Sequence, residues 1–192
     1  FYELTIAGCV VAEAGGRGQA VIDLTAGSWI LAAYVYGDGV DGLLTQAVEV
    51  TGEMGDPDDP DSDIDLNFVD FSFDVEERVV AGSQVWELEN DGEQPHFFSI
   101  YSYPGELTEA AVNAALFNAY GTAPQSIDPS VTPIDLGALV EMGGSGTMSA
   151  GTEAWLQLDL PKGTYLALCQ VTDRESGLPH AALGQFLIFT VE

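Results

Sequence analysis

Short segments in which apolar and polar residues alternate recur along the whole chain, and they constrain the fold more than any other feature of the sequence. Each segment is bounded by Gly, Asp or Pro, which is typical of strands that end in turns. Clear examples are residues 19–24, 65–71, 85–88 and 155–158. Because successive side chains of a strand point to opposite faces, each segment predicts a strand with one buried face. The sequence therefore predicts an all-β protein, and more narrowly a β-sandwich.

One segment has helical rather than strand spacing. Residues 107–120 carry Ala and Leu at helical intervals, follow Pro104-Gly105 and stop at Gly121. Proline and glycine are common just outside the two ends of a helix. We therefore expect one helix here, inserted between strands.

An acidic stretch divides the chain. Residues 55–63 contain no large apolar side chain and concentrate proline and aspartate, which favours a linker. The 192 residues, 46% of them hydrophobic, are enough for one full core and part of a second. We expect a linker at residues 53–63, between a partial domain of residues 1–52 and a full domain of residues 64–192.

The shorter part resembles the end of the longer one. Residues 23–33 align with residues 159–169 at a constant offset of 136, and both segments are followed by a glycine-containing turn and a strand. Such internal similarity indicates a repeated structural unit. Residues 1–52 are therefore expected to be a partial repeat of the domain's second half, which leaves strand edges unpaired and favours self-association through these residues.

The charge balance restricts the possible partners. The chain has 31 Asp plus Glu against 4 Lys plus Arg, so its net charge is −27. This charge repels nucleic acid and anionic membrane surfaces, and we exclude both as partners. Self-repulsion of this size is relieved at molar salt, where the Debye length is about 3 Å. The composition suggests a halophilic, high-salt habitat.

The N-terminal part bears on location and on cysteine chemistry. No run of about 18 apolar residues is present, so we expect no membrane insertion. Phe1 is not an initiator methionine, and we expect a processed, secreted parent with an extracellular, periplasmic or cell-surface location. Residues 6–9 are similar to a lipid-attachment box, but too few residues precede Cys9 for us to expect lipid there. The only internal disulfide possible is between Cys9 and Cys169.

A metal site is the chemistry that the remaining residues favour. A thiolate and two imidazoles, with a long fourth contact to Met, Gln or a carbonyl, make a copper site that exchanges one electron. The two histidines of the chain are His96, shortly after the strand at 85–88, and His180, eleven positions beyond Cys169. Taken alone, His96 would be an ordinary capping or surface residue, Cys169 a core residue and Gln185 a surface residue. Together they predict one site.

Two segments make the hypothesis specific. Residues 82–96 resemble the entry to the first copper histidine in the plastocyanin and azurin family, with a Gly before the strand, an Asn-x-Gly turn and a Pro-His pair. Residues 163–169, followed by His180, are similar to that family's C-terminal ligand loop. The resemblance covers roughly residues 62–192 and implies a cupredoxin-like Greek-key sandwich. It implies one type 1 copper with the ligands His96, Cys169, His180 and, at the axial position, Gln185.

The sequence departs from this family pattern in three places. The ten residues between Cys169 and His180 exceed the usual few, and resemble the long, proline-containing loop of copper nitrite reductases. Gln185 replaces methionine, as in stellacyanin-like members, which should lower the reduction potential. Leu168 stands where multicopper enzymes have a histidine that couples type 1 copper to a catalytic cluster. The resemblance therefore implies electron transfer rather than enzyme activity.

The partial repeat has no such ligands. At the aligned positions Ala33 replaces Cys169, and Thr45 replaces His180. We therefore expect one copper per chain.

The function implied is a mononuclear blue-copper carrier that exchanges one electron with a redox protein such as a cytochrome, steered by the acidic surface. We expect His180 to reach the surface inside an apolar patch formed by Leu178, Pro179, Ala181, Ala182 and Leu183. The alternative is a copper-free structural protein of a cell surface, sheath or filament, which the partial repeat supports. Copper storage or delivery is a third hypothesis.

Overall fold

The computed structural model describes residues 4–10, 19–35, 42–52, 59–75 and 78–192. The chain divides into two units, one formed by residues 1–22 and 60–192, the other by residues 23–59.

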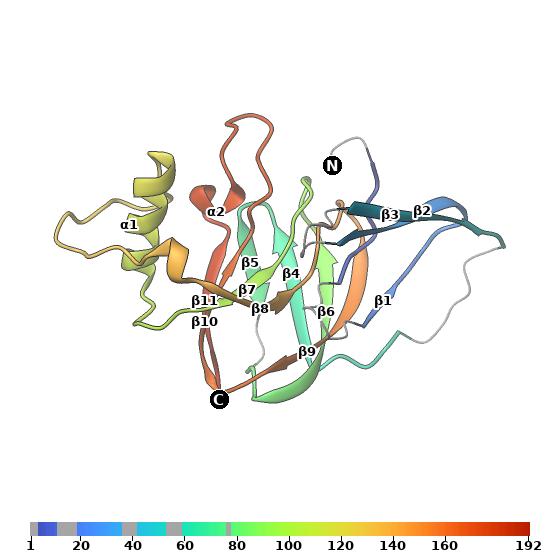
Figure 1. The fold of residues 1–192 in the computed structure, drawn as a ribbon, viewed down its shortest axis with the longest axis horizontal. Coiled ribbons are helices and arrows are strands. Elements are labelled where there is room, and N and C mark those ends of the chain that lie inside the picture. The colour runs from blue at the N-terminus through green and yellow to red at the C-terminus, as the bar shows by residue number, and fades with distance from the viewer. Residues whose placement is uncertain (1–3, 11–18, 36–41, 53–58, 76–77) are drawn as a thin grey trace. The chain divides into compact units, whose positions relative to one another are not determined.

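The larger unit contains two β-sheets that form a sandwich (Figure 1). The first sheet has the order β1-β9-β6-β4-β5 and consists of β1 (Ala20–Ile22), β4 (Ile64–Val69), β5 (Ser72–Val75), β6 (Gly82–Asn90) and β9 (Glu153–Leu160). The second has the order β11-β10-β7-β8 and consists of β7 (Ser99–Ser102), β8 (Val140–Gly144), β10 (Gly163–Leu168) and β11 (Phe186–Val191). Neighbours are antiparallel, except that β4 and β6 are parallel. The predicted all-β sandwich is confirmed.

The main core lies between the sheets and follows from the alternation along each strand. On β4, Ile64, Leu66 and Phe68 are buried, whereas the residues between them are more exposed. Trp86 of β6 packs against Phe98, with ring centroids 5.6 Å apart. Each large apolar side chain that leaves water contributes about 1.5–3 kcal/mol. Cys169, one of the predicted copper ligands, is part of this core.

β10 is buried on both faces because a helix covers the outside of its sheet. Tyr165 and Ala167 belong to the core between the sheets, together with Cys169. Leu166 and Leu168 point the other way, into a second cluster. That cluster contains residues of α1 (Glu109–Tyr120) and α2 (His180–Leu183): Ala111, Val112, Ala115, Leu116 and Ala181. The alternation of β10 thus directs Cys169 into the space between the sheets.

α1 begins and ends at residues with suitable chemistry. The Thr108 hydroxyl accepts a hydrogen bond from the Ala111 backbone N at 3.2 Å and caps the first turn. Gly121 ends the helix with a left-handed φ of 75°. The predicted helical insertion is confirmed, and it begins at Glu109 rather than at Leu107 because Thr108 is the cap.

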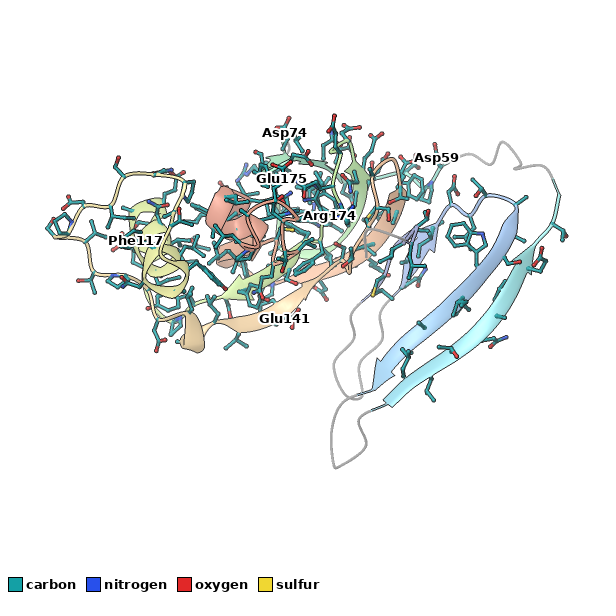
Figure 2. All side chains as sticks on the ribbon, turned by 90° about the horizontal axis from the view of Figure 1, so that it is seen from above. Asp59, Asp74, Phe117, Glu141, Arg174 and Glu175 are labelled. Atoms are coloured by element: carbon teal, nitrogen blue, oxygen red, sulfur yellow. The ribbon has the colours of Figure 1, made fainter. Side chains whose placement is uncertain are left out.

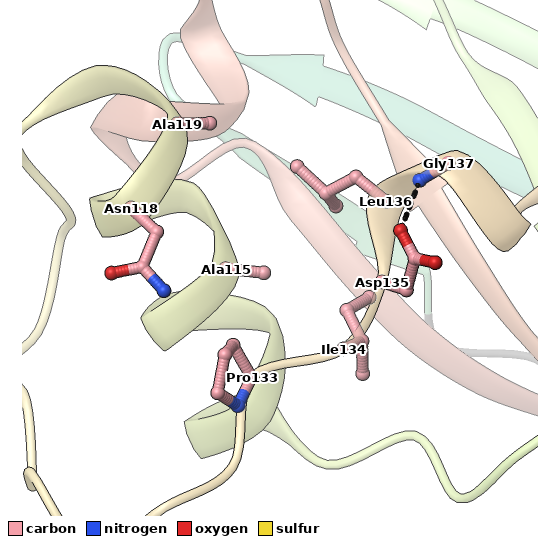
Figure 3. A pocket seen from close by; sticks show the side chains of 8 residues that line it. All are labelled: Ala115, Asn118, Ala119, Pro133, Ile134, Asp135, Leu136 and Gly137. Carbon is pink, nitrogen blue, oxygen red and sulfur yellow. Dashed lines mark hydrogen bonds between the residues drawn. The ribbon is translucent and has the colours of Figure 1, made fainter.

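A pocket lies between α1 and the segment that leads into the short 3-10 helix η1 (Leu136–Ala138), as Figure 3 shows. It is lined by Ala115, Asn118, Ala119, Pro133, Ile134, Asp135, Leu136 and Gly137. Asp135 is the one ionisable side chain among them, and its Oδ1 already accepts a hydrogen bond from the Gly137 backbone N at 2.9 Å. A functional pocket needs several converging polar groups, and this lining does not provide them.

The smaller unit is an antiparallel pair of strands, β2 (Gly27–Val35) and β3 (Gly42–Val50). Figure 2 shows their described side chains standing on a two-stranded ribbon. Gly27 lies opposite Val50. In the larger unit the aligned residue Gly163 lies opposite Val191, so the two hairpins start in the same register. This register is the one that a repeat would have, and the repeat itself stays a prediction.

The first 22 residues belong to the sandwich and not to the β2–β3 unit. Val21 of β1 lies opposite Trp155 on the outer edge of β9. The Ile6 backbone N donates to the Ser149 Oγ at 2.9 Å. A strand at a sheet edge has unpaired N–H and C=O groups, and β1 covers part of this edge of β9 by pairing with residues 154–156. The two units separate after Ile22, within the range 1–52, and β4 begins at Ile64. The expected domain boundaries stay a prediction.

We expect Gly144→Ala to destabilise the protein more than Gly143→Ala, by about 1–3 kcal/mol. Gly144 and Gly143 have φ angles of 138° and 140°, so alanine at either position causes a similar backbone strain. A Cβ on Gly144 would overlap the carbonyl oxygen of Phe98, whereas one on Gly143 would meet only the Leu158 Cδ2 at 3.6 Å. Urea unfolding of the two variants measures the difference, and equal stability would contradict the close approach of β8 to the segment after His96.

Candidate metal centre

His96 is held by a clamp at the end of β6. The buried side chain of Asn90 donates from Nδ2 to the carbonyl oxygens of Gln94 at 2.9 Å and Met148 at 3.0 Å. Its Oδ1 accepts from the Gly92 backbone N at 3.0 Å. His96 then forms a pair of backbone hydrogen bonds with Met148, at 3.0 and 2.8 Å. The Asn-x-Gly turn of the sequence thus fixes the fully buried imidazole of His96 between the sheets.

Cys169 follows β10 on its inner face and is fully buried. Its backbone N donates to the Gln185 carbonyl oxygen at 3.1 Å, which keeps the two residues side by side. Its Sγ accepts a hydrogen bond from the Phe97 backbone N at 3.4 Å. The thiol therefore lies between the segment that carries His96 and the segment that carries Gln185.

The long loop between Cys169 and His180 has a fixed internal structure. Thr172 and Pro179 form a β-bridge across it. Inside the bridge, the Asp173 Oδ2 accepts hydrogen bonds from the backbone N and the hydroxyl of Ser176, at 2.7 and 2.6 Å. The loop therefore folds back on itself, and its length does not separate His180 from Cys169.

Backbone hydrogen bonds place His180 at the first residue of α2. Its N donates to the Val171 carbonyl oxygen at 2.8 Å, and the Ala181 N donates to the Cys169 carbonyl oxygen at 2.8 Å. The Gln185 N donates to the His180 carbonyl oxygen at 3.0 Å. One short turn thus connects all three residues predicted from the C-terminal loop.

The three nitrogen and sulfur atoms converge on one point. His96 Nδ1 and His180 Nδ1 are 3.0 Å apart, and Cys169 Sγ lies 3.9 Å from the first and 3.6 Å from the second. Within the described residues, this is the cluster of His, Cys and carboxylate groups that could hold a metal ion. Metal bonds of about 2.0 Å to nitrogen and about 2.3 Å to sulfur place trigonal ligand atoms about 3.5–3.8 Å apart. The separations to sulfur match this, and the two nitrogens are closer.

The Gln185 side chain is a fourth polar group, close enough to both imidazoles to act on their pKa values. Its Nε2 donates to the carbonyl oxygens of Val69 at 3.3 Å and Ser72 at 3.0 Å. Its Oε1 is buried and has no hydrogen-bond partner among the described residues. Buried oxygen atoms are rarely left without a partner, and an amide oxygen is a suitable weak axial ligand. The donor set therefore fits a copper ion.

Burial sets the protonation of the three stronger donors. It lowers the pKa of His96 against the opposing effect of Asp70, and it lowers the pKa of His180 together with the nearby His96. Burial raises the pKa of the Cys169 thiol to about 11. Neutral imidazoles have a lone pair to offer, whereas the thiol keeps its proton until a cation displaces it.

Asp70 is a residue of the site that the sequence analysis missed. Its Oδ1 lies 2.9 Å from the Nε2 of His96, on the side of the ring away from the cluster. It stands in the turn between β4 and β5, 26 positions before His96, and no motif marks it. Only its position near the end of the predicted strand segment 65–71, among many aspartates, could have suggested a role.

The expected exposure of His180 is wrong. His180, Ala181 and Ala182 are all buried, so the predicted apolar patch does not surround an exposed imidazole. Ala181 packs in the second cluster with α1, and the Phe71 ring lies edge-on to the His180 ring with centroids 5.3 Å apart. The helical insertion and the β4–β5 turn thus cover His180.

The other cysteine takes no part in the site. Cys9 is exposed and Cys169 is buried, and both are free thiols. The possible disulfide between them is not formed.

Comparisons with known proteins give structural neighbours only. A scan against protein-family models and a search of curated proteins find no match. A dithionite-reduced auracyanin from the photosynthetic bacterium Roseiflexus castenholzii is 22% identical over 67% of this chain and 94% of its own, with a TM-score of 0.41. Auracyanin A, a "blue" copper protein from Chloroflexus aurantiacus, is 20% identical over 67% and 97%, with a TM-score of 0.40. Reduced rusticyanin is 17% identical over 67% and 75%, with a TM-score of 0.32.

The part of the chain that the structure describes contains no helix with the length and apolar character needed to cross a membrane.

We expect Asn90→Ala to lower the free energy of unfolding by about 2–4 kcal/mol, because it removes three hydrogen bonds of about 1 kcal/mol each, and also to weaken Cu(II) binding. Asn113→Ala is the matched control. Asn113, on α1, is equally buried at 1% exposure, and its side chain forms two hydrogen bonds with the backbone of Gln125. It should cost similar stability without changing Cu(II) affinity. Equal Cu(II) affinities in the two variants, measured by isothermal titration, would show that the clamp does not position His96.

Proposed function

We propose that this protein is a mononuclear copper electron carrier. The observation that carries the proposal is the convergence of His96 Nδ1, His180 Nδ1 and Cys169 Sγ on one buried point. Near the two imidazoles, the buried Oε1 of Gln185 has no hydrogen-bond partner among the described residues. Two imidazoles and a thiolate with a weak axial oxygen are the donor set of blue-copper electron-transfer sites. Bound copper would supply a one-electron couple.

The chain's own residues prepare the site for this task. His96 and His180 would offer Nδ1, Cys169 its thiolate, and Gln185 its amide oxygen. Each of these residues is buried, and each is tied to a strand or a neighbouring loop by backbone hydrogen bonds at 3.1 Å or less. A donor set held in this way rearranges little when the charge of the metal changes, which favours rapid electron exchange.

Carriage of electrons fits the surroundings of Cys169 better than catalysis does. Leu168, the residue before it, packs against α1 in the second cluster and offers no ligand to a second metal. One copper per chain is proposed, because the aligned residues Ala33 and Thr45 lack donor atoms of the required kind. The copper-free structural role is not favoured, since it gives no reason for four polar side chains to converge inside the core.

The partner and the location follow from charge and from the resemblance. The net charge of −27 would attract a redox protein with a basic docking face, such as a cytochrome, where salt is low enough for steering. An extracellular, periplasmic or cell-surface location is proposed for the parent protein. The burial of His180 means that the electron must enter through the atoms that cover it.

We expect Cu(II) to give the purified protein an intense thiolate-to-copper absorption at one copper per chain, and Cys169→Ala to abolish it, since only a bound thiolate supplies that transition. Cys9→Ala is the matched control, because Cys9 is the other free thiol and is exposed. It should keep both colour and stoichiometry. A coloured Cys169→Ala variant, or two tightly bound coppers per chain, would contradict the proposed site.

Gln185→Met should raise the reduction potential, because a soft thioether favours Cu(I) over Cu(II) relative to an amide oxygen. A tenfold change in relative affinity corresponds to about 59 mV for one electron. The matched control is Gln170→Met, at an exposed position next to Cys169, which should leave the potential unchanged. Voltammetry measures both, and an unchanged potential in Gln185→Met would exclude Gln185 as the axial ligand.

A further inference from the structure

The turn between β4 and β5 lies against the candidate ligands in a strained conformation. Phe71 has a φ of 63°, and it is the described non-glycine residue with a positive φ. A bulky side chain rarely adopts this left-handed conformation, which costs of order 1–3 kcal/mol unless the surroundings impose it. Here the Phe71 ring lies edge-on to His180, at an interplanar angle of 84°. The backbone on both sides of the turn accepts hydrogen bonds from Gln185. The site and the turn thus constrain each other.

Asp70, the residue before Phe71, collects three donors on one oxygen. Its Oδ1 lies 2.9 Å from His96 Nε2, 3.0 Å from the Glu93 backbone N and 3.2 Å from the Gln94 backbone N. Two of these donors are backbone N–H groups, which can only donate, so Oδ1 is held as a hydrogen-bond acceptor. Aspartate is ordinarily ionised at neutral pH, and this carboxylate fixes both the ring of His96 and the loop before it.

An ionised carboxylate can only accept hydrogen bonds, so its contact with His96 determines where the ring proton lies. Nε2 must carry the proton, which leaves the lone pair on Nδ1, the atom that faces Cys169 and His180. The two imidazoles differ in this respect. His180 Nε2 is buried and has no hydrogen-bond partner among the described residues. Of the two imidazoles, His96 is the one with a carboxylate at hydrogen-bond distance, whereas Asp173 and Asp70 act on His180 only through their charge.

We propose that Asp70 is a positioning residue, which fixes His96 as its Nε2–H tautomer and, through its negative charge, favours Cu(II) over Cu(I) at the site. Only the preference for Cu(II) over Cu(I) rests on the proposed copper function, and the tautomer of His96 does not. A carboxylate behind a metal-bound histidine orients the ring and raises its basicity, and loss of such a partner typically lowers metal affinity by about 10–100-fold. The same charge stabilises the more highly charged metal ion.

Two substitutions separate the hydrogen bond from the charge. Asp70→Asn keeps an Oδ1 that can accept from His96 Nε2 but removes the charge, whereas Asp70→Ala removes both. Asp74→Asn is the control for loss of one nearby negative charge. Asp74 lies four positions along the chain on β5, is exposed, and is labelled in Figure 2.

The first measurement needs no metal. ¹⁵N NMR of the histidine rings in the metal-free protein reports which ring nitrogen carries the proton. We expect the Nε2–H tautomer for His96 in the wild type, Asp70→Asn and Asp74→Asn, and a mixture of tautomers in Asp70→Ala. A wild-type His96 protonated on Nδ1, or an unchanged tautomer in Asp70→Ala, would overturn the positioning role, whether or not the protein binds copper.

The second measurement uses the copper-loaded protein. We expect Asp70→Asn to keep the thiolate absorption while its affinity for Cu(II) relative to Cu(I) falls about tenfold, a rise in potential of about 59 mV. Asp70→Ala should lose about 10–100-fold in Cu(II) affinity, and Asp74→Asn should match the wild type in both. Equal potentials in Asp70→Asn and Asp74→Asn would overturn the role of the charge. Absence of copper from the wild type would instead refute the proposed function, and the tautomer comparison would still decide the role of Asp70.

Discussion

Four polar side chains lie buried at one end of an apolar core, and the rest of the site depends on how their burial is compensated. A buried polar group without a partner costs about 1–3 kcal/mol. His96 is compensated by Asp70 and Cys169 by the Phe97 backbone N, whereas the Gln185 Oε1 and the His180 Nε2 have no partner among the described residues. The Gln185 side chain is close enough to His96 and His180 to act on their pKa values, so a cation held by these residues would compensate its Oε1. The arrangement is therefore easier to explain as a metal site than as a packed core.

Both packed layers serve this arrangement. The core between the sheets holds Cys169 on the inner face of β10, and the cluster under α1 holds Ala181, the residue after His180. The insertion thus supports the turn that carries His180, because Ala181 packs in one cluster with residues of α1. His180 itself is buried, so a redox partner of the proposed carrier would approach through the half-buried Phe71 or through neighbouring covering residues.

The sequence contained most of the fold and the four ligand candidates, because both depend on local patterns. Strand alternation and the glycine that ends α1 are properties of consecutive residues, and the positions of His96 and Cys169 follow short motifs. The contact of Asp70 with His96, the covering of His180 by Phe71 and the pairing of β1 with β9 join positions far apart in the chain. No spacing rule relates such positions, so only the packed structure reveals them.

The hairpins β2–β3 and β10–β11 differ in how far their strands stay paired, and this difference concerns the loop that carries His180. β2 and β3 stay paired over nine positions, as far as Val35 opposite Gly42. β10 and β11 start in the same register but stop after six positions, at Leu168 opposite Phe186. Beyond that point Cys169 and Gln185 share only one backbone hydrogen bond, and the chain leaves the ladder to form the loop and α2. Beyond Leu168 and Phe186 the two strands thus form no further ladder of hydrogen bonds, and the chain forms the turn that carries His180 instead. In β2 the ladder continues through Ala33, the residue aligned with Cys169, so this hairpin has no opening in which a comparable loop could place a second ligand.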